Sequence, residues 1–162
     1  MPGDEKAADL WARLRFLAGT WRGTSEGEPG TGTGERTYAF VLRDRFLEAR
    51  NRVVYPPQDK NPEGEIHEDL GLFSVDRVRK TIVLREFHVE GFVNQYIEQD
   101  ADGTDLVFVT EAIENIPRGW RARVRIARRG PDGFTESFEL AAPDEDFHPY
   151  SRSEWRRFAP NP

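Results

Sequence analysis

From Trp21 to Phe158 the chain is a succession of short segments in which apolar and polar residues alternate. A period of two indicates β-strands with one buried face, because successive side chains of a strand point to opposite faces of the sheet. The predicted strands cover 21–26, 36–42, 46–55, 67–75, 81–88, 92–99, 106–113, 120–127, 134–140 and 150–158. Tight turns join most of them, which favours an up-and-down meander over a sandwich with long crossing loops.

One segment with helical spacing precedes these strands. Its apolar residues are Leu10, Trp11, Leu14 and Leu17. Asp4 is placed for an N-cap and Gly19 for a left-handed ending, so we expect one helix over about residues 4–17. The chain is therefore predicted to be all-β and a single domain over residues 1–162. We expect a closed antiparallel up-and-down barrel of about ten strands over residues 20–158, with the helix covering one end.

The charge balance argues against nucleic acid as a partner. Lys and Arg total 23 against 29 Asp and Glu, a net charge of −6, which a phosphate backbone would repel. Arg121, Arg123 and Arg125 share the polar face of one predicted strand. We expect them to face water and to pair with acidic residues of neighbouring strands, and a basic stripe for an anionic partner is the alternative.

The composition also predicts a cytoplasmic protein with no membrane span. No apolar run reaches the ~20 residues that a spanning helix needs, and the first residues are charged where a signal peptide would be apolar. The chain has no cysteine, which fits a reducing compartment and leaves no thiolate chemistry. A homodimer and a monomer are both compatible with the sequence.

Four segments of the chain carry a family resemblance. They are Gly19-Thr-Trp-Arg-Gly23, Asp44-Arg-Phe-Leu-Glu48, residues 85–96 and residues 112–117. The first resembles the opening of calycins, the group of lipocalins, fatty-acid-binding proteins and nitrobindin-like barrels. The others resemble uncharacterised bacterial haem-binding-like barrels related to nitrobindin. The resemblance implies a barrel around an internal cavity that binds a small apolar or amphipathic ligand.

The resemblance also raises the question of haem. Nitrobindins hold ferric haem on a histidine near the start of the last strand, and His148 is the residue of this chain that matches that position. The glycine-spaced opening motif is shortened here, and Pro149 removes a backbone donor next to His148. We therefore expect no cofactor, with haem on His148 as the alternative.

Several polar residues fall on strand faces that are otherwise apolar. His88 and Glu86 alternate with Ile82 and Leu84, and a buried imidazole or carboxyl must find a partner or change its protonation. Some of these residues are expected to converge inside the barrel and orient the polar end of a ligand, together with Glu111 or Glu136. The alternative is a self-contained network that sets strand register. The candidate ligand-binding residues are His88, Glu86, Glu48, Arg50, Asn94, Tyr150 and Arg152.

Tyr150 and Arg152 enter that set because fatty-acid-binding proteins anchor a carboxylate with an arginine and a tyrosine spaced by one residue on the last strand. The order is reversed here.

Other motifs give little support for catalysis. Residues 30–34, Gly-Thr-Gly-Thr-Gly, open no helix and are predicted to be a loop. His67-Glu68-Asp69 has no second histidine at helical spacing, and we expect no metal site there. No Gly-x-Ser-x-Gly motif occurs. The predicted function is non-catalytic binding of a small, largely apolar molecule with a polar head. The alternatives are a haem protein and a small enzyme with His88 or Glu86 as general base.

Overall fold

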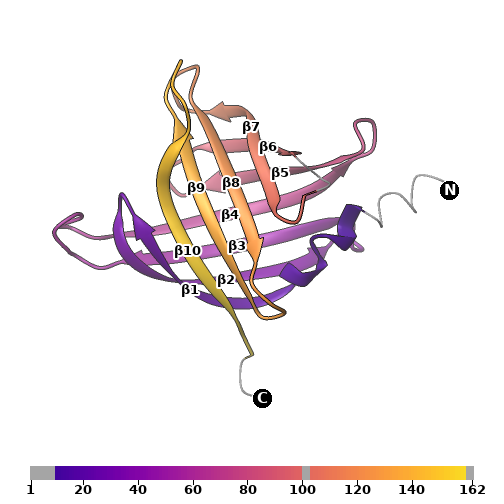
Figure 1. The fold of residues 1–162 in the computed structure, drawn as a ribbon, viewed down its shortest axis with the longest axis horizontal. Helices are drawn as coiled ribbons and strands as arrows, with labels where there is room; N and C mark the ends of the chain where they lie inside the picture. Colours follow the sequence, from indigo (N-terminus) through magenta and orange to yellow (C-terminus); the bar gives the residue numbers. More distant parts are fainter. Residues whose placement is uncertain (1–9, 100–102, 160–162) are drawn as a thin grey trace.

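The computed structural model describes residues 10–99 and 103–159. Ten antiparallel strands close into one barrel, in the order β1-β10-β9-β8-β7-β6-β5-β4-β3-β2 (Figure 1). The strands are β1 (Gly19–Gly27), β2 (Gly30–Val41), β3 (Phe46–Tyr55), β4 (Glu65–Asp76), β5 (Thr81–His88), β6 (Val93–Gln99), β7 (Leu106–Glu114), β8 (Arg121–Arg128), β9 (Gly133–Ala141) and β10 (His148–Phe158).

The first and last strands close the barrel. β1 pairs with β10 from Thr20 opposite Phe158 to Gly27 opposite Ser151, and it pairs with β2 on its other side. Each other strand pairs with its neighbours in the chain, so every one of these ten strands has a partner on both sides. Closure of this kind removes the sheet edges on which other chains could add a strand. The predicted all-β, ten-stranded, up-and-down barrel is confirmed.

A short helical segment covers one end of the barrel. Residues 10–12 are helical and a 3₁₀ turn, η1, spans Arg15–Leu17; the predicted residues 4–9, Asp4 among them, lie outside the described residues. Trp11, Leu14 and Leu17 are buried in the core of the barrel. Trp21 at the start of β1 is fully buried, and its indole N–H donates to the Leu17 carbonyl at 2.7 Å. The Gly-x-Trp segment therefore joins the helical cover to the first strand.

The glycine-rich stretch 30–34 is not a loop but the start of β2. A side chain at Gly32 would meet the Tyr55 ring at 2.7 Å, and one at Gly34 would meet Trp155 at 2.8 Å. The glycines thus make room for aromatic rings that pack against the strand. The prediction of a loop was wrong because it took glycine as a sign of flexibility.

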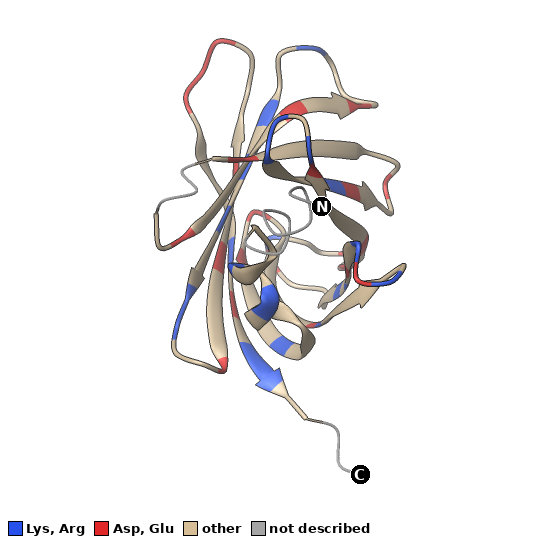
Figure 2. Cartoon of the chain, turned by 90° about the vertical axis from the view of Figure 1, so that its right-hand side faces the viewer, with Lys and Arg blue, Asp and Glu red and all other residues tan. Residues whose placement is uncertain are grey.

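The outer surface carries charges of both signs. Blue and red segments are interspersed along the strands of Figure 2. Arg123 pairs with Glu139, Arg125 pairs with Asp105, and Arg121 donates to the Glu145 carbonyl. The three arginines of β8 are therefore engaged by neighbouring groups. No helix within the described ranges is long and apolar enough to cross a membrane.

Candidate ligand-binding site

The barrel surrounds a cavity of about 410 Å³ that is lined by residues from all ten strands. This volume falls within the range of about 300–1,000 Å³ of known small-molecule sites. Much of the wall is apolar, and its largest apolar contributors include Phe73, Leu84, Ile126, Phe138, Leu140 and Trp155. Alternation in the strands explains this wall, because every second residue of a closed barrel points inward.

One group of polar residues in the cavity is held together by hydrogen bonds around Arg36. Arg36 of β2 reaches Glu136 of β9 through two hydrogen bonds of 2.8 and 3.0 Å. Its Nε donates to Asn51 at 3.0 Å, its Nη1 also contacts the Tyr38 hydroxyl, and its guanidinium lies 4.3 Å from the centre of the Trp155 ring. Arg36 therefore has its charge neutralised and most of its donors occupied within the protein.

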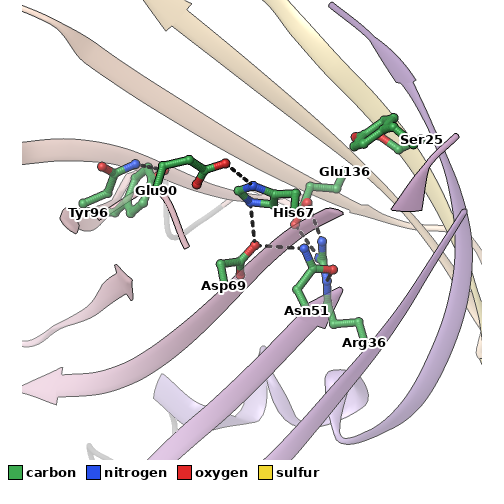
Figure 3. A network of polar contacts seen from close by, with 10 residues as sticks. Ser25, Arg36, Asn51, His67, Asp69, Glu90, Tyr96 and Glu136 are labelled. Carbon is green, nitrogen blue, oxygen red and sulfur yellow. Dashed lines mark hydrogen bonds and ion pairs between the residues drawn. The ribbon is translucent and has the colours of Figure 1, made fainter. Parts of the chain in front are cut away.

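A second group continues from Asn51 to the turn after β5. The Asn51 amide donates to Asp69 Oδ2 at 2.8 Å, and this oxygen lies 3.1 Å from His67 Nε2. His67 Nδ1 in turn lies 3.0 Å from Glu90. Figure 3 shows this chain of contacts from Glu90 through His67 and Asp69 to Asn51. The four residues belong to β3, β4 and the β5–β6 turn, and His67 and Asp69 share the inner face of β4.

The contacts shift the pKa values of these groups. Burial disfavours the charged form of His67, but hydrogen bonds with Asp69 and Glu90 outweigh it and raise the pKa of His67 to about 9. Burial would raise the pKa of Asp69, yet the hydrogen bond of His67 and the charge of Arg36 hold the pKa of Asp69 below its ordinary value. An ion pair between His67 and Asp69 therefore predominates at neutral pH.

A third group has unpaired polar atoms. Asn94 donates to the Tyr96 hydroxyl at 3.0 Å, and the other end of its buried amide, Oδ1, has no partner among residues 10–99 and 103–159. Nε2 of His88 is likewise buried and unpaired within these ranges. Glu86 lies directly opposite Asn94 across β5 and β6, and burial, with Asp69 and Glu136 adding to it, raises its pKa to about 8. All three side chains line the cavity.

Only some of the residues that the sequence predicts as a binding site lie in the cavity wall. His88, Glu86, Asn94 and Tyr150 line the cavity, and so does Glu136. Glu48, Arg50 and Arg152 do not.

The inner residues of β3 are Ala49, Asn51, Val53 and Tyr55, so Glu48 and Arg50 face outward, where they form an ion pair of 2.8 Å. Arg152 is exposed on β10. Glu111 pairs with Arg79 away from the cavity.

His148 does not fit the role of a haem ligand in this cavity. It is exposed at the first residue of β10, opposite Leu140, and it is not part of the cavity wall. A haem held in the barrel would need an imidazole directed into the apolar slot. The structure therefore gives the haem alternative no proximal histidine at this position.

Several cavity residues were not predicted from the sequence. They are Arg36, Tyr38, Asn51, His67, Asp69 and Tyr96. The sequence held one signal for His67 and Asp69, because residues two apart in a strand share a face. The prediction of no metal site considered helical spacing and adjacent residues, and it did not consider this spacing. The pairing of Asp69 with His88 across β4 and β5 depends on strand register, which no local pattern gives.

Three solved structures are similar to this chain to different degrees. The crystal structure of Rv2717c from M. tuberculosis matches with a TM-score of 0.67 and 17% identity over 93% of this chain and 98% of that chain. The structure of EF1p2_mFAP2b bound to DFHBI matches with a TM-score of 0.48 and 12% identity, over 92% and 99% of the two chains. A de novo designed fluorescence-activating β-barrel gives a TM-score of 0.46 and 15% identity, over 89% and 95% of the two chains.

The likeness to Rv2717c, at 17% identity, concerns the fold alone, and it supports the calycin-like resemblance only at the level of a β-barrel. No protein-family model and no curated protein matches the chain.

Proposed function

We propose that this protein binds one small, largely apolar molecule inside the barrel and holds its polar head at Asn94 and Glu86. The observation that carries the proposal is the unpaired end of the Asn94 amide, which is buried in the wall of a 410 Å³ cavity. A buried amide without a partner costs about 1–3 kcal/mol. A ligand that hydrogen-bonds to it recovers this energy.

The charged residues of the cavity wall indicate which charge the polar head of the ligand can carry. Arg36 is neutralised by Glu136, so it is not available for an anion. Asp69 is paired with His67, and Glu86, with its pKa raised to about 8, is largely uncharged at neutral pH. Glu65 and Glu90 add further negative charge to the wall. An anionic head would be repelled, and an uncharged or cationic head is favoured. The proposed ligand therefore differs from the fatty acids that the Arg-x-Tyr pair of fatty-acid-binding proteins anchors.

A purely structural network is the competing explanation for the polar residues. It describes Arg36, Asn51 and Glu136 well, because each is hydrogen-bonded within the protein. It leaves the free end of Asn94 without a reason, since a network that only sets strand register has no use for an unpaired group. We assign the first set to stability and Asn94 with Glu86 to ligand binding.

The proposal keeps the expectations of a non-catalytic protein and of a cytoplasmic location. The absence of cysteine from the sequence fits a reducing compartment such as the cytoplasm.

The experiment is a fluorescence titration with the neutral naphthalene dye 6-propionyl-2-(dimethylamino)naphthalene. We expect one dye per chain with a blue-shifted emission, because the dye leaves water for an apolar cavity. Dodecanol and dodecylamine should then displace the dye at lower concentrations than dodecanoate does. Equal displacement by dodecanoate would contradict the assignment of the head, and the absence of saturable dye binding would contradict the function.

A further inference from the structure

We propose that His67, Asp69 and His88 bind a divalent first-row transition-metal ion at the cavity wall. One nitrogen of each histidine and one oxygen of Asp69 lie within 4.8 Å of one another. Asp69 and His88 are directly opposite across β4 and β5, and His67 is two residues from Asp69 on the same strand face. The barrel itself therefore brings the three donors together.

The distances suit a common metal ion. Two ligands that each stand about 2.0–2.1 Å from a tetrahedral zinc ion are about 3.3 Å apart. His67 Nε2 and Asp69 Oδ2 are 3.1 Å apart, so an ion can take the place of the proton between them. The His67 and His88 ring centres are 5.4 Å apart, and a His88 ring nitrogen supplies the third donor within the same 4.8 Å.

His88 is the residue that points to a ligand rather than to an internal ion pair. Its Nε2 is buried and no group in the described part of the chain hydrogen-bonds to it. Burial lowers the pKa of His88, and a neutral imidazole is the form that coordinates metals. An ion pair between His67 and Asp69 needs no second imidazole beside it, whereas a metal site would use that imidazole as a third ligand.

The surroundings hold the other two donors in place. His67 Nδ1 lies 3.0 Å from a carboxylate oxygen of Glu90, an arrangement that directs Nε2 of a metal-bound histidine toward the ion. Asp69 is fixed by the Asn51 amide at 2.8 Å. Orienting contacts of this kind typically change metal affinity by about 10–100-fold. Glu90 and Asn51 are therefore positioning residues of the proposed site.

The donor set selects the class of ion. Two imidazoles and one carboxylate favour zinc and its first-row neighbours over magnesium and calcium, which prefer oxygen ligands. Three protein ligands leave at least one coordination position, and it faces the cavity because all three residues line it. Water or the head of a cavity ligand can occupy that position.

The test is a zinc titration of the EDTA-treated, desalted protein without an affinity tag, followed by calorimetry in a buffer that does not bind metals. The chain has three histidines and no cysteine, so His148 serves as an internal control. We expect one zinc ion per chain, at least about tenfold weaker binding for His88→Gln, His67→Gln and Glu90→Gln, and unchanged binding for His148→Gln. The spectrum of the Co²⁺ protein should lose its d–d bands in the same variants.

His88→Gln is the decisive variant, because His88 has no side-chain hydrogen bond to lose within the described ranges and circular dichroism can confirm its fold. The proposal is overturned if wild-type protein binds no stoichiometric zinc, if folded His88→Gln binds zinc within tenfold of wild type, or if His148→Gln weakens binding as much as His88→Gln does. The titration contains no organic ligand. Its failure would therefore leave the proposed cavity function standing, and failure of the dye titration would leave the metal site standing.

Discussion

Arg36 on β2 and Glu136 on β9, one hundred positions apart in the chain, are joined by two hydrogen bonds inside the barrel. Strands β1 and β10 lie between theirs in the sheet. The exposed fractions of the two side chains are only 9% and 18%. Each charge is therefore largely removed from water and depends on the other.

Removing one partner of this pair should cost more than removing both. Glu136→Ala leaves a buried guanidinium without its carboxylate, and we expect the free energy of unfolding to fall by about 3–5 kcal/mol. The double variant Arg36→Met/Glu136→Leu replaces the pair by apolar side chains of similar size and should lose less. Urea denaturation of both variants measures the difference. A double variant that is less stable than Glu136→Ala would contradict a pair in which each charge depends on the other.

Substitution of Trp21 tests how the helical segment that covers the end of the barrel is joined to the first strand. Its ring is fully buried, packs against Phe134 with ring centres 4.7 Å apart, and donates to Leu17. We expect Trp21→Ala to lower the free energy of unfolding by about 3–5 kcal/mol, as for other large-to-small core changes. Trp21→Phe should lose less, because it keeps most of the packing. A midpoint of denaturation close to that of wild type for Trp21→Ala would mean that the residue is not in the core.

The pH dependence of the free energy of unfolding should reveal the raised pKa of Glu98 on β6. Burial raises its pKa above the ordinary value of 4.5, although Arg13 opposes the shift. Between the ordinary and the raised pKa the folded state binds a proton that the unfolded state has lost. This contribution to stability is therefore complete below the ordinary pKa and is lost as the pH rises through the folded pKa, at up to about 1.4 kcal/mol per pH unit.

Glu98→Gln cannot titrate and should not show that loss. Thermal melts from pH 4 to pH 8 should therefore show the stability of Glu98→Gln rising relative to wild type as the pH increases. The opposite trend would mean that the ion pair with Arg13 outweighs burial and that the pKa of Glu98 is lowered.

Asn94 lines the cavity, and we expect it also to contribute to the affinity for a ligand. Asn94→Leu removes the unpaired amide oxygen, which is a hydrogen-bond acceptor. We expect dodecanol, whose hydroxyl can donate to that oxygen, to bind about 1–3 kcal/mol more weakly in the displacement of the naphthalene dye, the scale of one lost buried hydrogen bond. Gln95→Leu is the matched control, because Gln95 is the next residue of β6 and contacts Glu111 outside the cavity. Dodecanol affinity that falls equally in both variants would indicate a general loss of stability instead of a lost contact.

The sequence was sufficient for most of the strands, but not for the start of β2 or for the site. Alternation located β8 and placed Ala122, Val124 and Ile126 inside, because that strand has a single apolar face. In β3 both Phe46 and Leu47 are apolar, so alternation counted from Phe46 put Glu48 and Arg50 on the wrong face. A shift of one residue exchanges the two faces of a strand.

The cavity contacts also depend on pairings between distant strands. Glu86 opposite Asn94 and Asp69 opposite His88 follow from the register of β5 with its two neighbours. Arg36 with Glu136 follows from closure of the barrel. No local period contains this information. Alternation counted from Leu84 did place Glu86 and His88 on the inner face of β5.

The most direct test of ligand binding inside the barrel is to fill the cavity. Gly71 lines it on β4, and a Cβ added there meets its nearest neighbour, Leu84, at an ordinary 3.4 Å. The titration of the naphthalene dye should be repeated with Gly71→Leu and with Ala39→Leu, which adds a leucine at an exposed position of β2. We expect Gly71→Leu to remain folded and to lose dye binding, while Ala39→Leu binds the dye as wild type does. Wild-type affinity in folded Gly71→Leu would place the dye outside the cavity and contradict the proposed function.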